Sequence, residues 1–161
     1  MITIIGIDPG LSGTGIGLVR GEDAHVQSYS FGSIKTSAGD SIGQRLDRIY
    51  AQSLEFMMQE KPDMVVLEDI FSLEKFPGSG ILLGKVTGVL LLAAFRSGAS
   101  VREISVREAK KVVSGSGSAD KYQVERSVRE LLGHERAIRP FHASDALALA
   151  LTGFYRLSKQ L

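Results

Sequence analysis

The chain has 161 residues, of which 43% are hydrophobic and 23% charged, and its formal net charge is +1. These values are ordinary for a soluble globular protein, and the length suits one domain over residues 1–161. The absence of cysteine excludes disulfides, zinc–thiolate sites and thiol nucleophiles, and it fits a cytoplasmic location. The longest apolar stretch, 81–95, is short for a membrane span and contains Lys85, so we expect a core or interface helix and no membrane partner.

Charge is divided unevenly along the chain. Residues 1–74 carry 5 basic and 11 acidic side chains, a net charge of −6, whereas residues 75–161 carry 14 and 7, a net charge of +7. Such asymmetry suggests a polyanion partner for the second half. An ordinary fluctuation of surface charge explains it equally well.

The first part of the chain predicts three antiparallel strands and a helix. Residues 2–8 have the β-branched, apolar pattern of a buried strand, and 15–20 and 24–34 follow as two more. Their short, glycine-containing connections predict a meander. Apolar residues at helical spacing then predict a helix over 41–61, which Pro62 ends.

The second part predicts alternating strands and helices. Residues 63–69 predict a strand that contains the continuous apolar run MVVL, which is typical of a central parallel strand. Three antiparallel strands followed by two parallel ones, with helices between them, predict an α/β protein with a mixed five-stranded sheet flanked by helices. The remaining predicted elements are a helix at 80–96, a strand at 99–104 and helices at 105–113, 121–132 and 142–158.

Three carboxylates and a histidine are candidates for a metal-dependent site. Asp8 and Glu68 end two apolar strands, and such residues meet at one edge when the strands are parallel neighbours. Asp145 lies in the apolar run ASDALALAL, one helical turn after His142. Because clustered carboxylates repel one another, a hard divalent cation such as Mg²⁺ or Mn²⁺ would stabilise them.

Each of these residues also has a simpler interpretation. Asp8 precedes Pro-Gly and could start a turn, and Glu68 could be a solvated strand end. Asp145 could pair with an arginine, and His142 could be an ordinary residue at the start of a helix. Only their combination favours a site.

Taken in order, five segments resemble the RuvC family of Holliday-junction resolvases. The resemblance implies a ribonuclease-H-like fold, a homodimer, and metal-dependent nicking of two opposed strands of four-way junction DNA in recombination and repair. It also implies two Mg²⁺ or Mn²⁺ ions per active site and a branch-migration partner of the RuvA–RuvB type. The segments are GIDPGLSGTGIGLV (6–19), VVLEDIF (65–71), GSGILLGKVTGVLLLAA (78–94), SVREAKKVVSGSGSADKYQVERSVRELL (105–132) and HASDALALAL (142–151).

The family's four active-site positions coincide with the candidate residues Asp8, Glu68, His142 and Asp145, which the resemblance implies to be catalytic and metal-binding. Many family members have aspartate where this chain has His142, although histidine also occurs in the family. Imidazole suits Mn²⁺ better than Mg²⁺. We therefore expect Mn²⁺ to support cleavage at least as well as Mg²⁺.

The resemblance also implies residues that bind DNA. Lys110 and Lys121 flank a Gly/Ser loop and match basic positions near the scissile strand, although a solvated surface loop is the simpler interpretation. Phe71 matches an aromatic residue that stacks on an unpaired base, or else it belongs to the core. Lys85 is a further candidate, but the loop before it departs from the family's commoner pattern.

Gly80, Gly84 and Gly88 recur at intervals of four in the predicted helix 80–96. Because glycine weakens a helix, this strip suggests close approach of another element, either the sheet or a second subunit. The family places its dimer contact on this helix.

Two other functions remain open on the sequence. An actin-like ATPase or sugar kinase also begins with a strand and a GIDPG-like phosphate loop, but it needs two lobes and a second Asp-x-Gly loop. A non-catalytic junction-binding module with a decayed site is the second alternative, and His142 is the only feature that favours it.

Overall fold

A mixed five-stranded sheet forms the centre of the computed structural model, which describes residues 1–69 and 77–159. The strand order is β3-β2-β1-β4-β5, with antiparallel pairing among β1, β2 and β3 and parallel pairing of β4 with both β1 and β5. The prediction of the sheet, including a central parallel strand, is confirmed. The strands are β1 (Ile2–Asp8), β2 (Gly13–Glu22), β3 (His25–Lys35), β4 (Met64–Glu68) and β5 (Ser100–Ile104).

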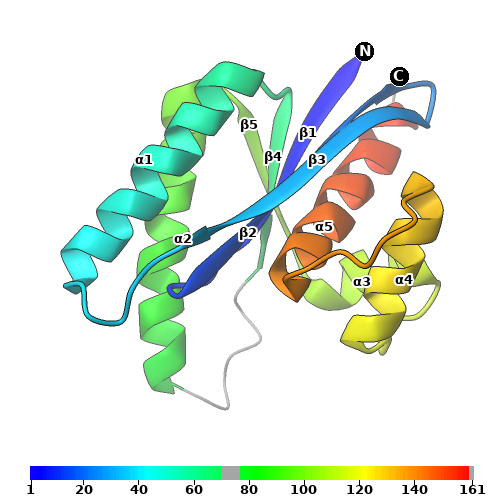
Figure 1. The fold of residues 1–161 in the computed structure, drawn as a ribbon. Coiled ribbons are helices and arrows are strands. Elements are labelled where there is room, and N and C mark those ends of the chain that lie inside the picture. Colours follow the sequence, from blue (N-terminus) through cyan, green and yellow to red (C-terminus); the bar gives the residue numbers. More distant parts are fainter. Residues whose placement is uncertain (70–76, 160–161) are drawn as a thin grey trace.

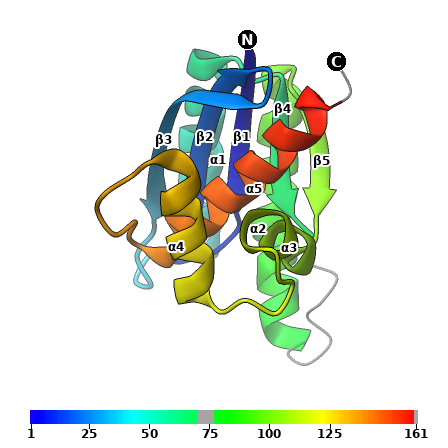
Figure 2. The same ribbon diagram turned by 90° about the vertical axis from the view of Figure 1, so that its right-hand side faces the viewer.

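Helices cover both faces of the sheet, so the protein has three layers (Figures 1 and 2). Helices α1 (Ile42–Glu60) and α2 (Pro77–Ser97) lie on one face, over an apolar core that includes Ile5, Ile7 and Leu67. The opposite face carries α5 (Phe141–Ser158), with α3 (Val106–Ser114) and α4 (Lys121–Leu132) beside it.

The predicted elements are found within a few residues of their expected bounds, and the differences have local causes. The β2–β3 hairpin turns at Asp23 and Ala24, both with positive φ, so β2 extends to Glu22 and β3 begins at His25, one residue later than expected. Helix α2 begins at Pro77 rather than at 80, because proline is tolerated in the first turn of a helix. Ser41 and Asp120 form capping boxes that fix the starts of α1 and α4.

Helix α5 lies unusually close to the sheet because glycines face it. A Cβ atom on Gly6 of β1 would stand 2.0 Å from the carbonyl oxygen of Ala146, and one on Gly17 of β2 would stand 2.6 Å from the backbone nitrogen of Leu147. At Gly15 the nearest atom would be the carbonyl oxygen of His142, at 1.9 Å. No larger residue fits at these positions without moving α5.

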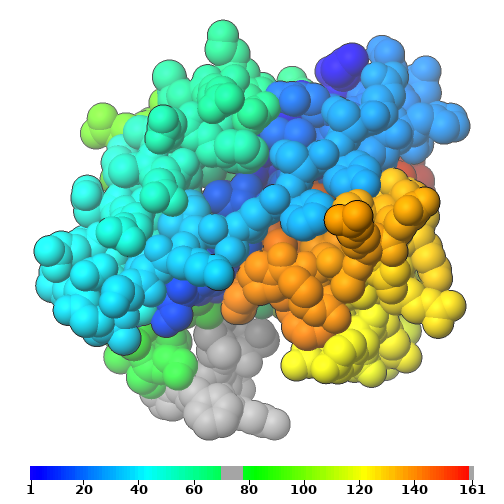
Figure 3. Space-filling model, in the orientation of Figure 1, coloured from blue at the N-terminus to red at the C-terminus, as the bar shows by residue number. Residues whose placement is uncertain are grey.

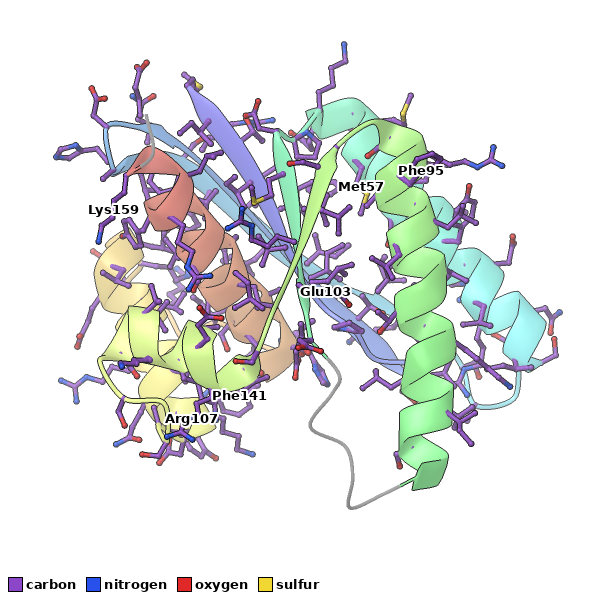
Figure 4. The ribbon with its side chains drawn as sticks, turned by 180° about the vertical axis from the view of Figure 1, so that it is seen from behind. Met57, Phe95, Glu103, Arg107, Phe141 and Lys159 are labelled. Atoms are coloured by element: carbon purple, nitrogen blue, oxygen red, sulfur yellow. The ribbon has the colours of Figure 1, made fainter. Side chains whose placement is uncertain are left out.

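Helix α2 is long and apolar enough to cross a membrane by length and composition, with a mean hydropathy of 1.7 over Gly78–Ser97. This is weak evidence for a membrane span, since core helices pass the same test. Only 28% of this apolar stretch is buried, and large apolar side chains such as Ile81 and Phe95 are exposed. Phe95 points outward from α2 in Figure 4. The apolar surface of α2 is therefore only partly covered by this chain.

Candidate active site

Strand alternation directs Asp8 and Glu68 to the same face of the sheet. In β1, Ile2 and Ile4 pack on the α5 side, and Asp8 continues this even-numbered series. In β4, Met64 and Val66 face α5, so Glu68 does as well. The parallel register pairs the residue before Asp8 with the residue before Glu68, so the two carboxyl groups are direct neighbours, and a hydrogen bond joins them.

Helix α5 brings the other two candidates to the same place. His142 and Asp145 lie one turn apart at the start of α5, where Gly15 allows the helix to approach β2. The Nδ1 atom of His142 is 2.6 Å from Oδ2 of Asp8. Asp8 is almost fully buried, whereas half of the His142 side chain is exposed. The histidine therefore forms the outer wall of the site.

All four candidate residues line one pocket of about 270 Å³, together with Lys110 of α3 and Lys121 of α4. The structure therefore brings together residues that are up to 137 positions apart in the chain. Lys85 is exposed on α2 and is not among the described residues that line the pocket. Phe71 lies outside the described residues. The other lining residues are Val106, Ala109, Val124, Ala148 and Leu149.

Burial and mutual repulsion raise the pKa values of Glu68 and Asp145. Burial, the hydrogen bond to Asp8 and the charges of Asp8 and Asp145 raise the pKa of Glu68 to about 9, against the opposing charge of Lys110. Burial and the charge of Asp8 raise the pKa of Asp145 to about 6. The hydrogen bond to Asp8 raises the pKa of His142, although burial opposes it. Without a cation, the site holds protons that isolated side chains would release at neutral pH.

This donor set fits a hard divalent cation. Three carboxyl groups supply oxygen ligands, and the raised pKa values of Glu68 and Asp145 reflect burial and mutual repulsion, both of which a bound cation would offset. Asp8 occupies Nδ1 of His142, so Nε2 is the ring nitrogen open to a cation or water. Over residues 1–69 and 77–159, no three acidic or histidine side chains already have the geometry of a metal site. Binding a cation therefore requires the carboxyl groups to move closer together around it.

The sequence analysis missed an aromatic cluster beside the pocket. Phe141 of α5 directly precedes His142 and packs edge-on against Tyr122 of α4, with ring centres 5.0 Å apart. The Arg139 guanidinium carbon lies 4.2 Å from the centre of the Phe141 ring. In the sequence, Tyr122 follows Lys121 and Phe141 precedes His142. This proximity to two candidate site residues could have indicated the cluster.

The fold and the acidic site together define a ribonuclease-H-like protein. The family model described as "Crossover junction endodeoxyribonuclease RuvC" matches residues 4–153. The chain belongs to the RuvC family, as its sequence segments indicated.

Individual relatives are similar over almost their whole length. The crossover junction endodeoxyribonuclease RuvC of Syntrophomonas wolfei is 38% identical over 160 residues, which are 98% of this chain and 92% of that protein. Thermus thermophilus RuvC in complex with Holliday junction substrate is 33% identical, with a TM-score of 0.89 over 97% of this chain and 95% of that one. The structure titled "Thermus thermophilus RuvC structure" has a TM-score of 0.82 over 97% and 96% of the two chains. These matches confirm the predicted ribonuclease-H-like fold.

Proposed function

We propose that this protein is a metal-dependent endodeoxyribonuclease that resolves four-way DNA junctions by paired, symmetric nicks in recombination and repair. The observation that carries the proposal is the single pocket in which Asp8, Glu68, His142 and Asp145 meet two lysines. Family membership and the similarity to a RuvC structure with Holliday junction substrate support the choice of substrate.

The proposed roles follow from the chemistry of each group. Asp8, Glu68 and Asp145 hold two Mg²⁺ or Mn²⁺ ions, with His142 at the exposed side of the site. Bound ions of this kind activate a water molecule and stabilise the leaving oxygen of a phosphodiester. Lys110 and Lys121 supply positive charge at the pocket, which attracts the DNA backbone.

We also propose a homodimer in which the exposed apolar surface of α2 is the interface. A Cβ atom on Gly88 would meet no other atom within 4 Å, so the space beside this glycine is not used within the chain. Exposed Ile81 and Phe95 lie on the same helix. Two copies would present two active sites to the two symmetric strands of a junction. The resemblance further implies a branch-migration partner of the RuvA–RuvB type and a cytoplasmic location.

A labelled synthetic four-way junction tests the nuclease proposal. The protein is incubated with the junction and Mg²⁺ or Mn²⁺, beside Asp8→Asn and a matched exposed control, Asp47→Asn on α1. We expect symmetric nicks with the wild type and Asp47→Asn, no nicks with Asp8→Asn, and junction binding by all three. A linear duplex of the same sequence should stay intact.

Other outcomes identify the alternatives. Junction binding by the wild type without nicks would favour the non-catalytic module. Hydrolysis of a nucleotide without nicks would favour the actin-like ATPase.

A further inference from the structure

An exposed aromatic side chain stands beside the candidate active site without a packing role that accounts for it. Tyr122 is 60% exposed at the start of α4. Burial of its ring therefore contributes little to the stability of the fold. Among the described residues, the one aromatic ring that packs against Tyr122 is that of Phe141, at the start of α5. In Figure 3 the orange segment that leads into α5 lies directly against yellow α4, so the two helix starts share one surface.

Two cations surround these rings. The Lys121 ammonium lies 4.9 Å from the centre of the Phe141 ring and 5.4 Å from that of Tyr122. The Arg139 guanidinium carbon lies 4.2 Å from the Phe141 ring centre. Aromatic faces flanked by positive charge are the elements with which proteins hold single-stranded nucleic acid, because bases stack on the rings while cations hold the backbone.

The cluster is continuous with the candidate active site. Lys121 lines the pocket and also contacts both rings, and Phe141 is followed by His142 in the chain. Figure 4 shows Phe141 at the end of α5 where the helix begins, beside α3 and α4. A strand with its phosphate in the pocket therefore has a neighbouring nucleotide within reach of Tyr122.

A buried glutamate fixes the cluster before any ligand binds. Glu125 is 4% exposed and accepts a hydrogen bond of 2.8 Å from the backbone N–H of Ile138. Its carboxylate is also 2.8 Å from Nε of Arg129 and 3.8 Å from Nη1 of Arg139. The loop that carries Arg139 to Phe141 is therefore held to α4. A platform that is already ordered loses little entropy when a base stacks on it.

We propose that Tyr122 and Phe141, with Lys121 and Arg139, form a nucleotide subsite that stacks an unpaired base next to the scissile phosphate. This inference rests on the proposed function, because it takes the ligand to be a DNA strand bound in the catalytic pocket. Phe71, which follows β4 in the sequence, is predicted to stack a base. The subsite proposed here belongs to different elements, α4 and α5.

Binding to a synthetic four-way junction without divalent metal tests the subsite independently of strand cleavage. Tyr122→Leu removes the ring, Tyr122→Phe keeps it, and Arg126→Ala removes an exposed cation on α4 outside the cluster. We expect Tyr122→Leu to weaken binding about tenfold. Tyr122→Phe and Arg126→Ala should bind within about twofold of the wild type. Circular dichroism and the melting temperature verify that each variant folds, which the exposure of Tyr122 favours.

Abasic substitutions in the junction identify the stacked base. A single abasic nucleotide is moved through the positions next to the crossover, and each junction is titrated with the wild type and Tyr122→Leu. At one position, the missing base should weaken binding by the wild type about as much as Tyr122→Leu does, and the two changes together should cost no more than either alone.

Two results would overturn the proposed subsite. One is that Tyr122→Leu binds the junction with wild-type affinity. The other is that the loss of affinity caused by Tyr122→Leu adds to the loss caused by the abasic substitution at every position. Failure of the proposed function is distinct, since it would appear as a wild type that binds the junction but does not cut it with Mg²⁺ or Mn²⁺.

Discussion

Asp8 takes part in both hydrogen bonds that link the candidate catalytic groups, one with His142 and one with Glu68. The three side chains come from β1, β4 and α5, so Asp8 joins elements from both ends of the chain. Its burial and central position explain why Asp8→Asn is the decisive variant for the nuclease proposal.

Glu68 should make the metal-free protein less stable at alkaline pH. Its pKa is about 9 in the folded protein against an ordinary value of 4.5. The associated stability is therefore complete below pH 4.5 and is lost as the pH rises toward 9. Glu68→Gln cannot ionise, so at pH 8 without metal it should be more stable than the wild type by about 1–2 kcal/mol, a value reduced for partial solvent screening.

Thermal unfolding at two pH values measures this effect. We expect a melting temperature a few degrees higher for Glu68→Gln at pH 8 and equal melting temperatures near pH 4. Glu55→Gln, at an exposed position on α1, is the matched control. A gain of the same size at both pH values would show that ionisation of Glu68 is not its cause.

His142 should set the preference for the metal ion. Imidazole favours Mn²⁺ over Mg²⁺, whereas carboxylate ligands suit both ions. We expect the wild type to cut junctions at least as fast with Mn²⁺ as with Mg²⁺, and His142→Asp to shift the ratio of the two rates toward Mg²⁺. Nicking rates in parallel metal titrations provide the measurement. A wild type that strongly prefers Mg²⁺ would contradict the prediction.

At the scale of elements, the packing of α5 on β1 and β2 determines where His142 and Asp145 lie. Gly17→Ala should destabilise the protein by about 1–3 kcal/mol, because the new methyl group would stand 2.6 Å from the backbone of Leu147. Gly32→Ala is the matched control, since a Cβ on this glycine of the edge strand β3 meets nothing within 4 Å. Chemical denaturation measures both. Equal stability of the two variants would mean that α5 moves without cost.

The sequence predicted most elements because their signals are local. Ser41 with Gln44 marks the start of α1, and Asp120 with Gln123 marks the start of α4. The contact of Gly15 with His142 was not predictable, since it depends on how α5 crosses the sheet. The same holds for Tyr122 and Phe141, which meet only in the folded chain.

For the candidate site, the residue types and strand positions were enough to nominate Asp8, Glu68, His142 and Asp145. Their convergence on one pocket required the register of β1 with β4 and the approach of α5. The raised pKa of Glu68 also depends on this convergence, because burial and the nearby carboxylates cause it.

At the scale of the whole molecule, α2 should mediate association of two copies. Gly84→Leu and Gly88→Leu place bulk in the strip of glycines, and within this chain the space beside Gly88 is open. We therefore expect Gly88→Leu to weaken dimerisation at least tenfold while the monomer stays folded. Gly84→Leu should weaken dimerisation or folding.

Sedimentation velocity over a range of protein concentrations measures the dimer. Gly43→Leu on α1 is the matched control, because a Cβ at this exposed helical glycine also meets nothing within 4 Å. An unaltered dimer of normal stability in both α2 variants would contradict the proposed interface.

The order of the elements along the chain has a consequence during synthesis. Asp8 and Glu68 leave the ribosome early, but His142 and Asp145 belong to α5, the last helix, which also covers the glycine-lined face of β1 and β2. A nascent chain that lacks α5 has a bare sheet face and half of its candidate catalytic groups. If the proposed function holds, an unfinished or truncated copy cannot nick DNA, because completing the fold and completing the active site are the same event.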